Sequence, residues 1–346
     1  MKNKKYIFTV ILMIIIVSTP VFPQNLNLDE LSKKVDKFTD SMAAALPLNS
    51  AIGLNWSDAY IGQLLRVPPH FGVGVSLGAT TMDYSSIMDM LSAFNINIPF
   101  VNNDIFKSIG MPLPGYAVEG RIGGFILPFD IGIKAGYLPQ NLLGNISDDF
   151  NFGLKHMLVG LDFRYSLFSK KVLPIRISAG LGVNYLEGGI NASIPTASSF
   201  EFTNPENSDS YTISASDTNA GLSWRTVSAE LKTQISFPMK FFTPYAGAGV
   251  SYAYSTAGYL IKSEITVKKD NGDPVNLNDV NDILKGYGLT SISDSGFESM
   301  KNFHNISARA FAGGSINLWV IRIDLTAMYE FFSGNLGATF GLRFQL

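Results

Sequence analysis

Charged residues of both signs recur at alternate positions within otherwise apolar stretches of this chain. Such residues share the polar face of a β-strand, because successive side chains of a strand point to opposite sides. If that face lines a narrow interior, pairing across strands is expected, since an unpaired charge in a confined space is costly. The alternatives are ion selection and anchoring of a ligand carboxylate. The expected interior charges are Glu119, Arg121, Asp130, Lys134, Asp162, Arg164, Arg176, Glu230, Lys232, Arg309, Arg322, Asp324, Glu330 and Arg343.

Catalysis by a serine and a histidine is the next chemistry that the residues suggest. The three histidines are His70, His156 and His304. A nucleophilic serine needs its base within hydrogen-bond reach, which here requires a neighbouring strand and the same face. His304 is next to Asn305 and near Ser307, but adjacent strand positions face opposite sides. We therefore expect no enzymatic activity.

Aspartates gather in one stretch, 270–282, which could bind calcium. The run Asp270-Asn-Gly-Asp273 lacks the D-x-[DN]-x-[DN]-G spacing of an EF-hand. Asn-Gly flanked by aspartates is typical of a tight turn. We predict no metal site and no cofactor, and a formal net charge of −2 gives no indication of nucleic-acid binding.

The elements that position these residues are strands. The segment 335–346 (NLGATFGLRFQL) alternates apolar with small or polar residues to its last position. Each such segment can cross a membrane as a tilted strand of about 9–11 residues, whereas a soluble sandwich would have strands of about 5–6. The alternation predicts an all-β transmembrane antiparallel up-and-down β-barrel of 10–14 strands. The ten segments are 71–80, 116–126, 129–137, 156–167, 175–185, 226–237, 242–254, 306–317, 319–331 and 335–346.

The composition and the N-terminus agree with a barrel in a bacterial outer membrane. Charged residues make up 16% of the chain, against about 25% in soluble domains. Lys2, Lys4 and Lys5 precede the apolar run 7–17, which predicts a cleaved signal peptide over 1–24. The absence of cysteine excludes a lipoprotein anchor. The last strand resembles the C-terminal strand of bacterial outer-membrane barrels, which the barrel-assembly machinery recognises. This machinery and outer-membrane lipid are therefore the expected partners.

The lengths of the connections between strands predict which end of the barrel faces the outside of the cell. Long connections at 81–114, 139–151, 189–219 and 257–304 alternate with short ones until the last hairpin at 333–334, and long loops of such barrels lie outside the cell. The segment 258–268 is either a further strand or an extension of the strand before it. Ile52, Leu54 and Trp56 also alternate, and we assign them to an N-terminal segment inside or beneath the barrel.

An amphipathic helix is predicted over 27–46, ahead of the barrel at 69–346. Because it precedes the first strand, we expect it in the periplasm or the lumen. The segment 25–68 is then either a plug or a periplasmic element packed on the rim. The residues of its apolar stripe are Leu28, Leu31, Val35, Phe38, Met42 and Leu46.

Two long loops carry shorter helical patterns with an apolar face. These loops would sit at the external mouth, where an apolar surface needs cover. They either pack together as a lid or form an apolar groove through which a ligand enters. The residues concerned are Ile87, Met88, Leu91 and Phe94 in the first loop, and Val280, Ile283 and Leu284 in the last.

This layout resembles the long-chain fatty-acid transporter (FadL-like) family of outer-membrane proteins. The runs 55–64 (NWSDAYIGQL) and 68–72 (PPHFG) are also similar to uncharacterised FadL-like proteins. The resemblance implies passive transport of small hydrophobic molecules, fatty-acid-like ligands among them, through a plugged barrel. The alternative is a non-transporting surface barrel whose long external loops bind ligands, as an adhesin does. A closed, packed lumen would favour the alternative, and a lateral gap or an apolar channel would favour transport.

Overall fold

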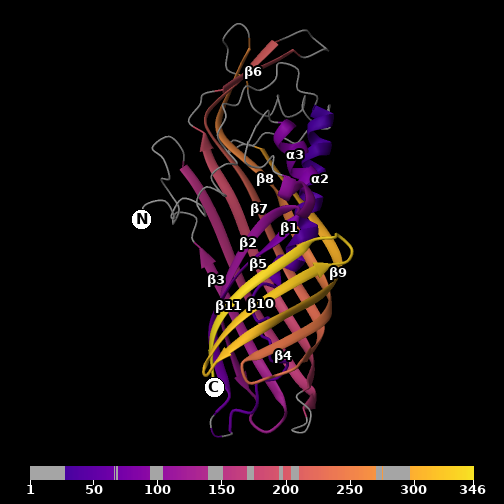
Figure 1. Cartoon of the computed structure of the whole chain (residues 1–346). Helices are drawn as coiled ribbons and strands as arrows, with labels where there is room; N and C mark the ends of the chain where they lie inside the picture. Colours follow the sequence, from indigo (N-terminus) through magenta and orange to yellow (C-terminus); the bar gives the residue numbers. More distant parts are fainter. Residues whose placement is uncertain are drawn as a thin grey trace, which may run out of the picture.

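Ten strands close into an antiparallel barrel in a computed structural model of the chain (Figure 1), which describes residues 28–65, 67, 69–93, 104–138, 151–169, 175–194, 198–203, 210–269, 275 and 297–346. Neighbouring strands follow the chain order, and β5 pairs with β7 to complete the circle. The barrel strands are β1 (Phe71–Met82), β2 (Met111–Gly123), β3 (Phe129–Leu138), β4 (Asn151–Ser169), β5 (Arg176–Ile194), β7 (Ser210–Ser236), β8 (Phe242–Lys269), β9 (Phe297–Leu318), β10 (Ile321–Glu330) and β11 (Leu336–Gln345). All ten predicted strands are confirmed.

The barrel wall is apolar outside and polar inside. Along β1, Val73 and Leu77 are 55% and 59% exposed, whereas Ser76 and Thr80 on the opposite face of the strand are buried. The same alternation runs through β11. A soluble protein would bury these apolar residues, so the exposed belt is a surface for lipid acyl chains.

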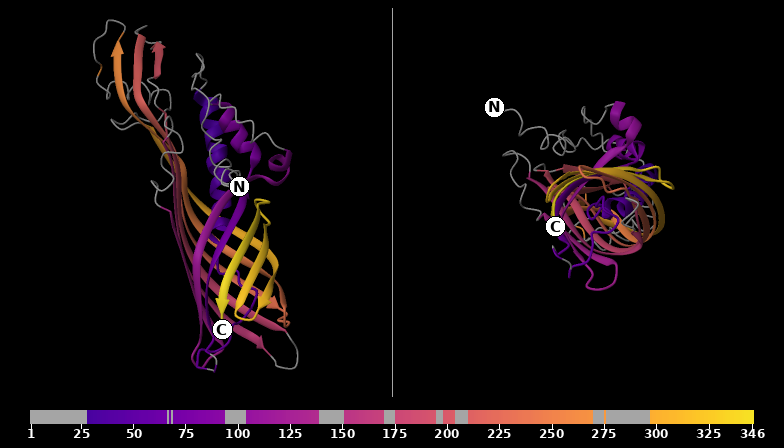
Figure 2. Two further views of the ribbon diagram at one scale, coloured as in Figure 1. Left: turned by 60° about the vertical axis from the view of Figure 1, so that its left-hand side comes forward. Right: turned by 60° about the horizontal axis from the view of Figure 1, so that its bottom comes forward.

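The wall differs in height around the barrel (Figure 2). β10 and β11 have 10 residues each, which at the usual tilt covers little more than the apolar band of about 25 Å. β7 and β8 have 27 and 28 residues and project well beyond it. The segment 258–268 is therefore an extension of β8, and not a further strand of the barrel. A short strand, β6 (Ser198–Thr203), pairs with β7 on the projecting part.

The two ends of the barrel are distinct. The short connections 124–128, 237–241 and 319–320 lie at the end that holds the C-terminus, where the Leu346 N–H donates to the Phe71 carbonyl (3.0 Å). At the opposite end, which we call the mouth, lie the helices α3 (Tyr84–Ala93) and α4 (Asp104–Ile109). Among the described residues, no helix is long and apolar enough to cross a bilayer.

The N-terminal helix α2 (Leu28–Ser50) also lies at the mouth, beside α3 (Figures 1 and 2). Lys37 Nζ contacts Asp89 Oδ2 of α3 at 2.7 Å, and Lys301 Nζ of β9 contacts Asp36 Oδ1 at 2.6 Å. The helix was expected in the periplasm or the lumen. Only its C-terminal half fits that expectation, because the chain enters the barrel from the mouth and leaves it at the other end.

Several predictions fall on residues that the structure does not describe. These are the signal peptide at 1–24, Phe94, and the loop residues Val280, Ile283 and Leu284. Leu28, Leu31, Val35 and Leu91 lie within described helices, but their side chains are outside the described part.

Candidate functional site

The upper lumen is filled by the C-terminal half of α2. Phe38 and Met42, two residues of the predicted stripe, are 4% and 3% exposed. They belong to an apolar cluster with wall residues from several sides of the barrel. Ile87 of α3 is buried in the same cluster, and Met88 packs against it. The wall residues of the cluster are Met82, Met111, Leu113, Ala117, Leu158, Leu186, Trp224 and Ala257.

Side chains of the wall hold the end of this helix. Pro47 has no N–H, so the carbonyl of Ala43 loses its helical partner. The Asn305 amide of β9 donates to that carbonyl instead (3.0 Å). Asn49, near the end of the helix, donates to the Thr80 hydroxyl (3.0 Å) of β1. The helix therefore ends in bonds to two different strands of the wall, and α2 is fixed in the barrel.

A sharp turn then directs the chain down the lumen. Gly53 and Leu54 both have positive φ, +84° and +59°, a conformation that is unfavourable for leucine. A Cβ at Gly53 would lie 3.1 Å from both Ala117 Cβ and Lys134 Cδ, so a larger residue would crowd the wall. The Leu54 N–H donates to Glu119 of β2, which holds the strained residue in place.

The segment 51–61 then runs through the lumen without regular secondary structure, and each of its residues is buried. A buried irregular backbone has to find partners for its N–H and C=O groups. Here the barrel wall supplies them, from β3, β7 and β8 among other strands. Lys134 donates to the carbonyls of Ser50 and Ile52 (2.7 Å each), Tyr245 to the carbonyl of Asn55 (2.9 Å), and Gln234 to the carbonyl of Trp56 (2.8 Å). Ser236 accepts a hydrogen bond from the Ala59 N–H (3.0 Å), and Asp130 accepts one from the Ile61 N–H (3.1 Å).

Trp56 is the largest fully buried side chain of the described residues. Its indole Nε1 donates to Glu119 Oε1 (2.8 Å), and the Arg343 guanidinium lies 4.5 Å from the ring centroid. Arg121 lies on the ring as well, at 5.6 Å. A Cβ at Gly72 would come within 2.8 Å of Trp56 Cη2, so β1 needs glycine where the indole meets the wall.

Most of the lumen charges pair with one another, whereas Lys134 and Glu119 bind the threaded segment. Asp130 forms ion pairs with Arg121 (2.5 Å) and Arg164 (2.9 Å), and all three of these side chains are buried. Arg309 binds Glu230 with two nitrogens (2.5 and 3.0 Å). These pairs join different strands of the wall, and buried ion pairs of this kind need such added hydrogen bonds to offset desolvation.

Asp58 is a lumen charge that we did not predict. It lies in the threaded segment, within 3.2 Å of Arg343 and 3.4 Å of Arg176, and Gln345 donates to it (3.1 Å). The run 55–64 contains this aspartate, but no strand periodicity marks it as an interior charge. Arg343 also contacts Asp324 at 2.8 Å. The threaded segment is thus bound ionically near its exit.

Two further predicted lumen charges, Glu330 and Arg322, lie near the ends of the barrel. Glu330 lies at the β10–β11 hairpin, where its carboxylate accepts hydrogen bonds from Ser333 N (2.5 Å) and Ala308 N (3.2 Å). It thereby fixes the hairpin. Arg322 is half-buried at the opposite end of the barrel.

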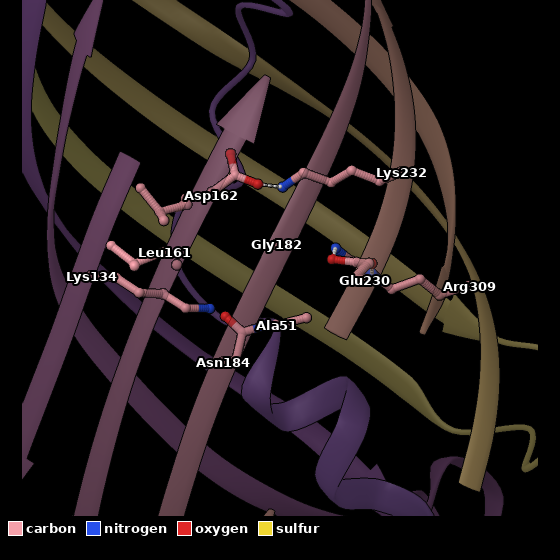
Figure 3. A pocket seen from close by; sticks show the side chains of 11 residues that line it. Ala51, Lys134, Leu161, Asp162, Gly182, Asn184, Glu230, Lys232 and Arg309 are labelled. Atoms are coloured by element: carbon pink, nitrogen blue, oxygen red, sulfur yellow. Dashed lines mark hydrogen bonds and ion pairs between the residues drawn. The ribbon is translucent and has the colours of Figure 1, made fainter. Parts of the chain in front are cut away.

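A cavity of about 10 Å³, room for about one water molecule, remains beside the threaded segment (Figure 3). Lys134, Asn184 and Arg309 line it, and Lys232 Nζ meets Asp162 Oδ2 at 2.7 Å on its wall. Sites for drug-sized molecules usually have about 300–1,000 Å³ and apolar walls. This cavity is smaller and strongly charged, which suits water better than a hydrophobic ligand.

The histidines are separated in the structure. His304 Nδ1 lies 2.7 Å from the Tyr252 hydroxyl on the outer face of the wall. His156 lies beside Tyr116, with 5.1 Å between ring centroids and the two rings tilted by 32°. His70 Nδ1 lies 3.2 Å from the Leu346 carbonyl, at the end of the barrel opposite the mouth.

The exposed apolar belt and the buried polar lumen together define a transmembrane β-barrel, the architecture of bacterial outer membranes. The lumen of this one is filled by its own N-terminal segment. The chain belongs to the Lsa36-like family, whose model matches residues 34–344. The resemblance to the FadL-like family stays a prediction.

Solved structures of outer-membrane and related proteins also match. Ail, the attachment invasion locus protein of Yersinia pestis, is 8% identical (TM-score 0.25), with 80% of this chain and 97% of Ail covered. A major outer membrane protein from Thermus thermophilus is 10% identical (TM-score 0.28; 80% and 99% covered). The CymD monoaromatic hydrocarbon channel is 10% identical (TM-score 0.23; 90% and 96% covered). No curated protein matches the chain.

Proposed function

We propose that this protein is a non-transporting outer-membrane barrel that displays a ligand-binding surface outside the cell. The observation that carries the proposal is the filled lumen. Residues 38–61 occupy it from the mouth to the exit, with apolar packing above and hydrogen bonds from the wall below. A route for solutes would require this segment to leave, and breaking so many buried contacts at once is costly.

The long loops and projecting strands then become the functional part. The mouth carries α2, α3, α4 and the extended ends of β7 and β8, whereas the connections 124–128, 237–241 and 319–320 at the other end are short. Long loops of outer-membrane barrels face the outside. The barrel serves as an anchor, and its external elements meet the ligand.

Conductance of the refolded full chain in a planar lipid bilayer tests this function. We expect no steady ion current. A matched variant, Trp56→Ala with Asp58→Lys, removes the indole and reverses the charge that meets Arg343, and it should leak. A steady current through the unaltered protein, at a level similar to that of the variant, would refute the proposal.

Transport of hydrophobic molecules is the second candidate, because one observation favours it. The apolar cluster at the mouth contains Met42, Met82 and Met111, with Met88 against it, and flexible methionines adapt to varied apolar ligands. Ile87 and Met88 of the predicted ligand-uptake residues lie there. Trp224 belongs to the cluster, so a brominated fatty acid bound there would quench its fluorescence relative to a Trp224→Phe control. Equal quenching in both proteins would remove this candidate.

A further inference from the structure

The outer face of β7 changes from apolar to charged at one position on the mouth side. Val227 is 46% exposed, and the next outward residue towards the mouth, Arg225, is exposed as well. Val227 is 10 positions from Phe237, the exposed aromatic residue at the opposite end of the apolar stretch. At about 3.4 Å per residue and a tilt of about 40°, this stretch covers about 26 Å of membrane thickness, the usual height of the apolar band. Arg225 therefore lies at the level of the lipid headgroups.

The neighbouring strands have the same boundary, because the register aligns them with Arg225. Opposite Arg225 are Glu187 of β5 and Thr256 of β8, which are both polar. Tyrosines gather where a barrel wall leaves the apolar band, since the ring is apolar and the hydroxyl is polar. The next outward positions towards the membrane centre are Tyr185, Val227 and Tyr254.

Charged side chains of three adjacent strands form a cluster at this boundary. We call Lys155 of β4, Tyr185 and Glu187 of β5, and Arg225 of β7 the basic patch. Lys155 Nζ pairs with Glu187 Oε1, and the Tyr185 hydroxyl donates to Glu187 Oε2 (2.6 Å). The Arg225 guanidinium interacts with both groups of β5, by a hydrogen bond to the hydroxyl and by charge with the carboxylate. Two cations share one carboxylate, so the patch has a net positive charge.

The two cations of the basic patch are accessible and rich in donors. Arg225 is exposed, and 42% of the Lys155 side chain is exposed. A guanidinium has five N–H donors in a fork that matches a phosphate, and an ammonium group has three. Within the patch, one hydroxyl and one carboxylate cannot satisfy all of these donors. The patch is therefore suited to a phosphate.

We propose that the basic patch binds an anionic lipid of the leaflet on the mouth side. Its phosphate lies between Arg225 and Lys155, and its acyl chains lie on the exposed side chains of Val159, Val183 and Val227 below. A free phosphate gains only the ionic contacts, whereas a lipid also gains the apolar wall. The inference goes beyond the proposed function, since it requires a barrel that spans a membrane and does not depend on the filled lumen.

Native mass spectrometry of the refolded full chain tests the site, with bound lipids counted as phosphatidylglycerol is titrated into the detergent. A cation near anionic lipid contributes a preference of about fivefold. Arg225→Gln combined with Lys155→Gln should therefore weaken binding of the first phosphatidylglycerol by more than about tenfold. Phosphatidylcholine, which has no net charge, should bind the two proteins equally. Equal affinity of the unaltered protein for the two lipids would overturn the inference.

Lys107→Gln is the matched control for Lys155→Gln. Lys107 also lies at the mouth, with 48% of its side chain exposed, and pairs with one carboxylate, that of Asp104 (3.1 Å). Lys107→Gln should leave lipid binding unchanged, whereas Lys155→Gln alone should weaken it several-fold. Equal effects of the two substitutions would show a general attraction to surface charge, with no site at the basic patch.

Glu187→Gln gives a result that a loss of folding cannot imitate. It removes the negative charge of the basic patch, so phosphatidylglycerol should bind about fivefold more tightly. Unchanged or weaker binding would contradict the proposal.

Glycerophosphoglycerol, the same headgroup without acyl chains, separates a lipid from a soluble anion. It should compete only at concentrations far above that of the lipid. Equal affinity for the headgroup and the lipid would assign the patch to a soluble anion and overturn the inference. Bilayer conductance of the same protein tests the proposed function separately.

Discussion

The indole of Trp56 donates to the carboxylate of Glu119 at 2.8 Å, so that a residue of the threaded segment is bound to the wall of β2. The same carboxylate accepts from the Leu54 N–H and from the Ser76 hydroxyl (3.0 Å) of β1. One buried carboxylate on β2 thus serves three donors, two from the thread and one from β1. This contact joins the strained turn at Leu54 to the barrel, and we regard it as the centre of the closed lumen.

Removing the indole should weaken the whole molecule. Trp56 is 1% exposed, and truncation of a buried Trp to Ala usually costs about 3–5 kcal/mol. We expect Trp56→Ala to lower the melting temperature of the folded barrel in detergent, followed by its heat-modifiable gel mobility. Trp319→Ala is the control, since Trp319 is 91% exposed, and it should melt as the unaltered protein does. Equal melting of both variants would contradict the assignment.

Pro47 and Asn305 should be thermodynamically coupled. Asn305→Ala leaves the Ala43 carbonyl without a partner and should cost about 1–3 kcal/mol. In a Pro47→Ala background the helix can supply its own N–H to that carbonyl, so Asn305→Ala should cost much less. Unfolding measurements on the two single variants and the double variant give the interaction energy. Strict additivity would show that the asparagine does not act through this carbonyl.

The N-terminal half of α2 should be accessible from outside the cell. The chain has no cysteine, so a single introduced thiol reports its own position. Lys33 of α2 and Lys240 of the β7–β8 turn are both exposed, at opposite ends of the molecule. On intact cells, a membrane-impermeant maleimide should label Lys33→Cys and leave Lys240→Cys unlabelled until the cells are lysed. The reverse pattern would show that the barrel is inserted in the other orientation.

Acid should loosen α3 through Asp83. Burial raises the pKa of this carboxyl, but hydrogen bonds from Ser86 and Ser85 outweigh it, and the net pKa lies below its usual value of 3.8. A lowered pKa in the folded state means that the contribution to stability is present above about pH 4 and is lost as the pH falls further. Hydrogen exchange of α3 amides should therefore speed up below about pH 4. Asp83→Asn, which keeps a capping oxygen, should remove most of that pH dependence.

The sequence by itself determined the barrel and its wall. Alternation along Leu336 to Leu346 is a local property, because side chains of a strand take opposite faces whatever the rest of the chain does. The same rule placed Arg164, Arg309 and Arg343 in the interior. The apolar stripe at Phe38 and Met42 likewise follows from helix geometry alone.

Only the tertiary structure decided what fills the lumen. Asp58 and Arg343 are 285 positions apart, and no periodicity links an irregular segment to the wall that binds it. The position of α2 at the mouth could not be predicted from the sequence either, because its amphipathic pattern fits both ends of the barrel. The strand count depended on whether β8 continued past Gly258, and that is fixed by its pairing with β7. These features rest on contacts between distant residues, whereas the barrel pattern rests on the geometry of each strand.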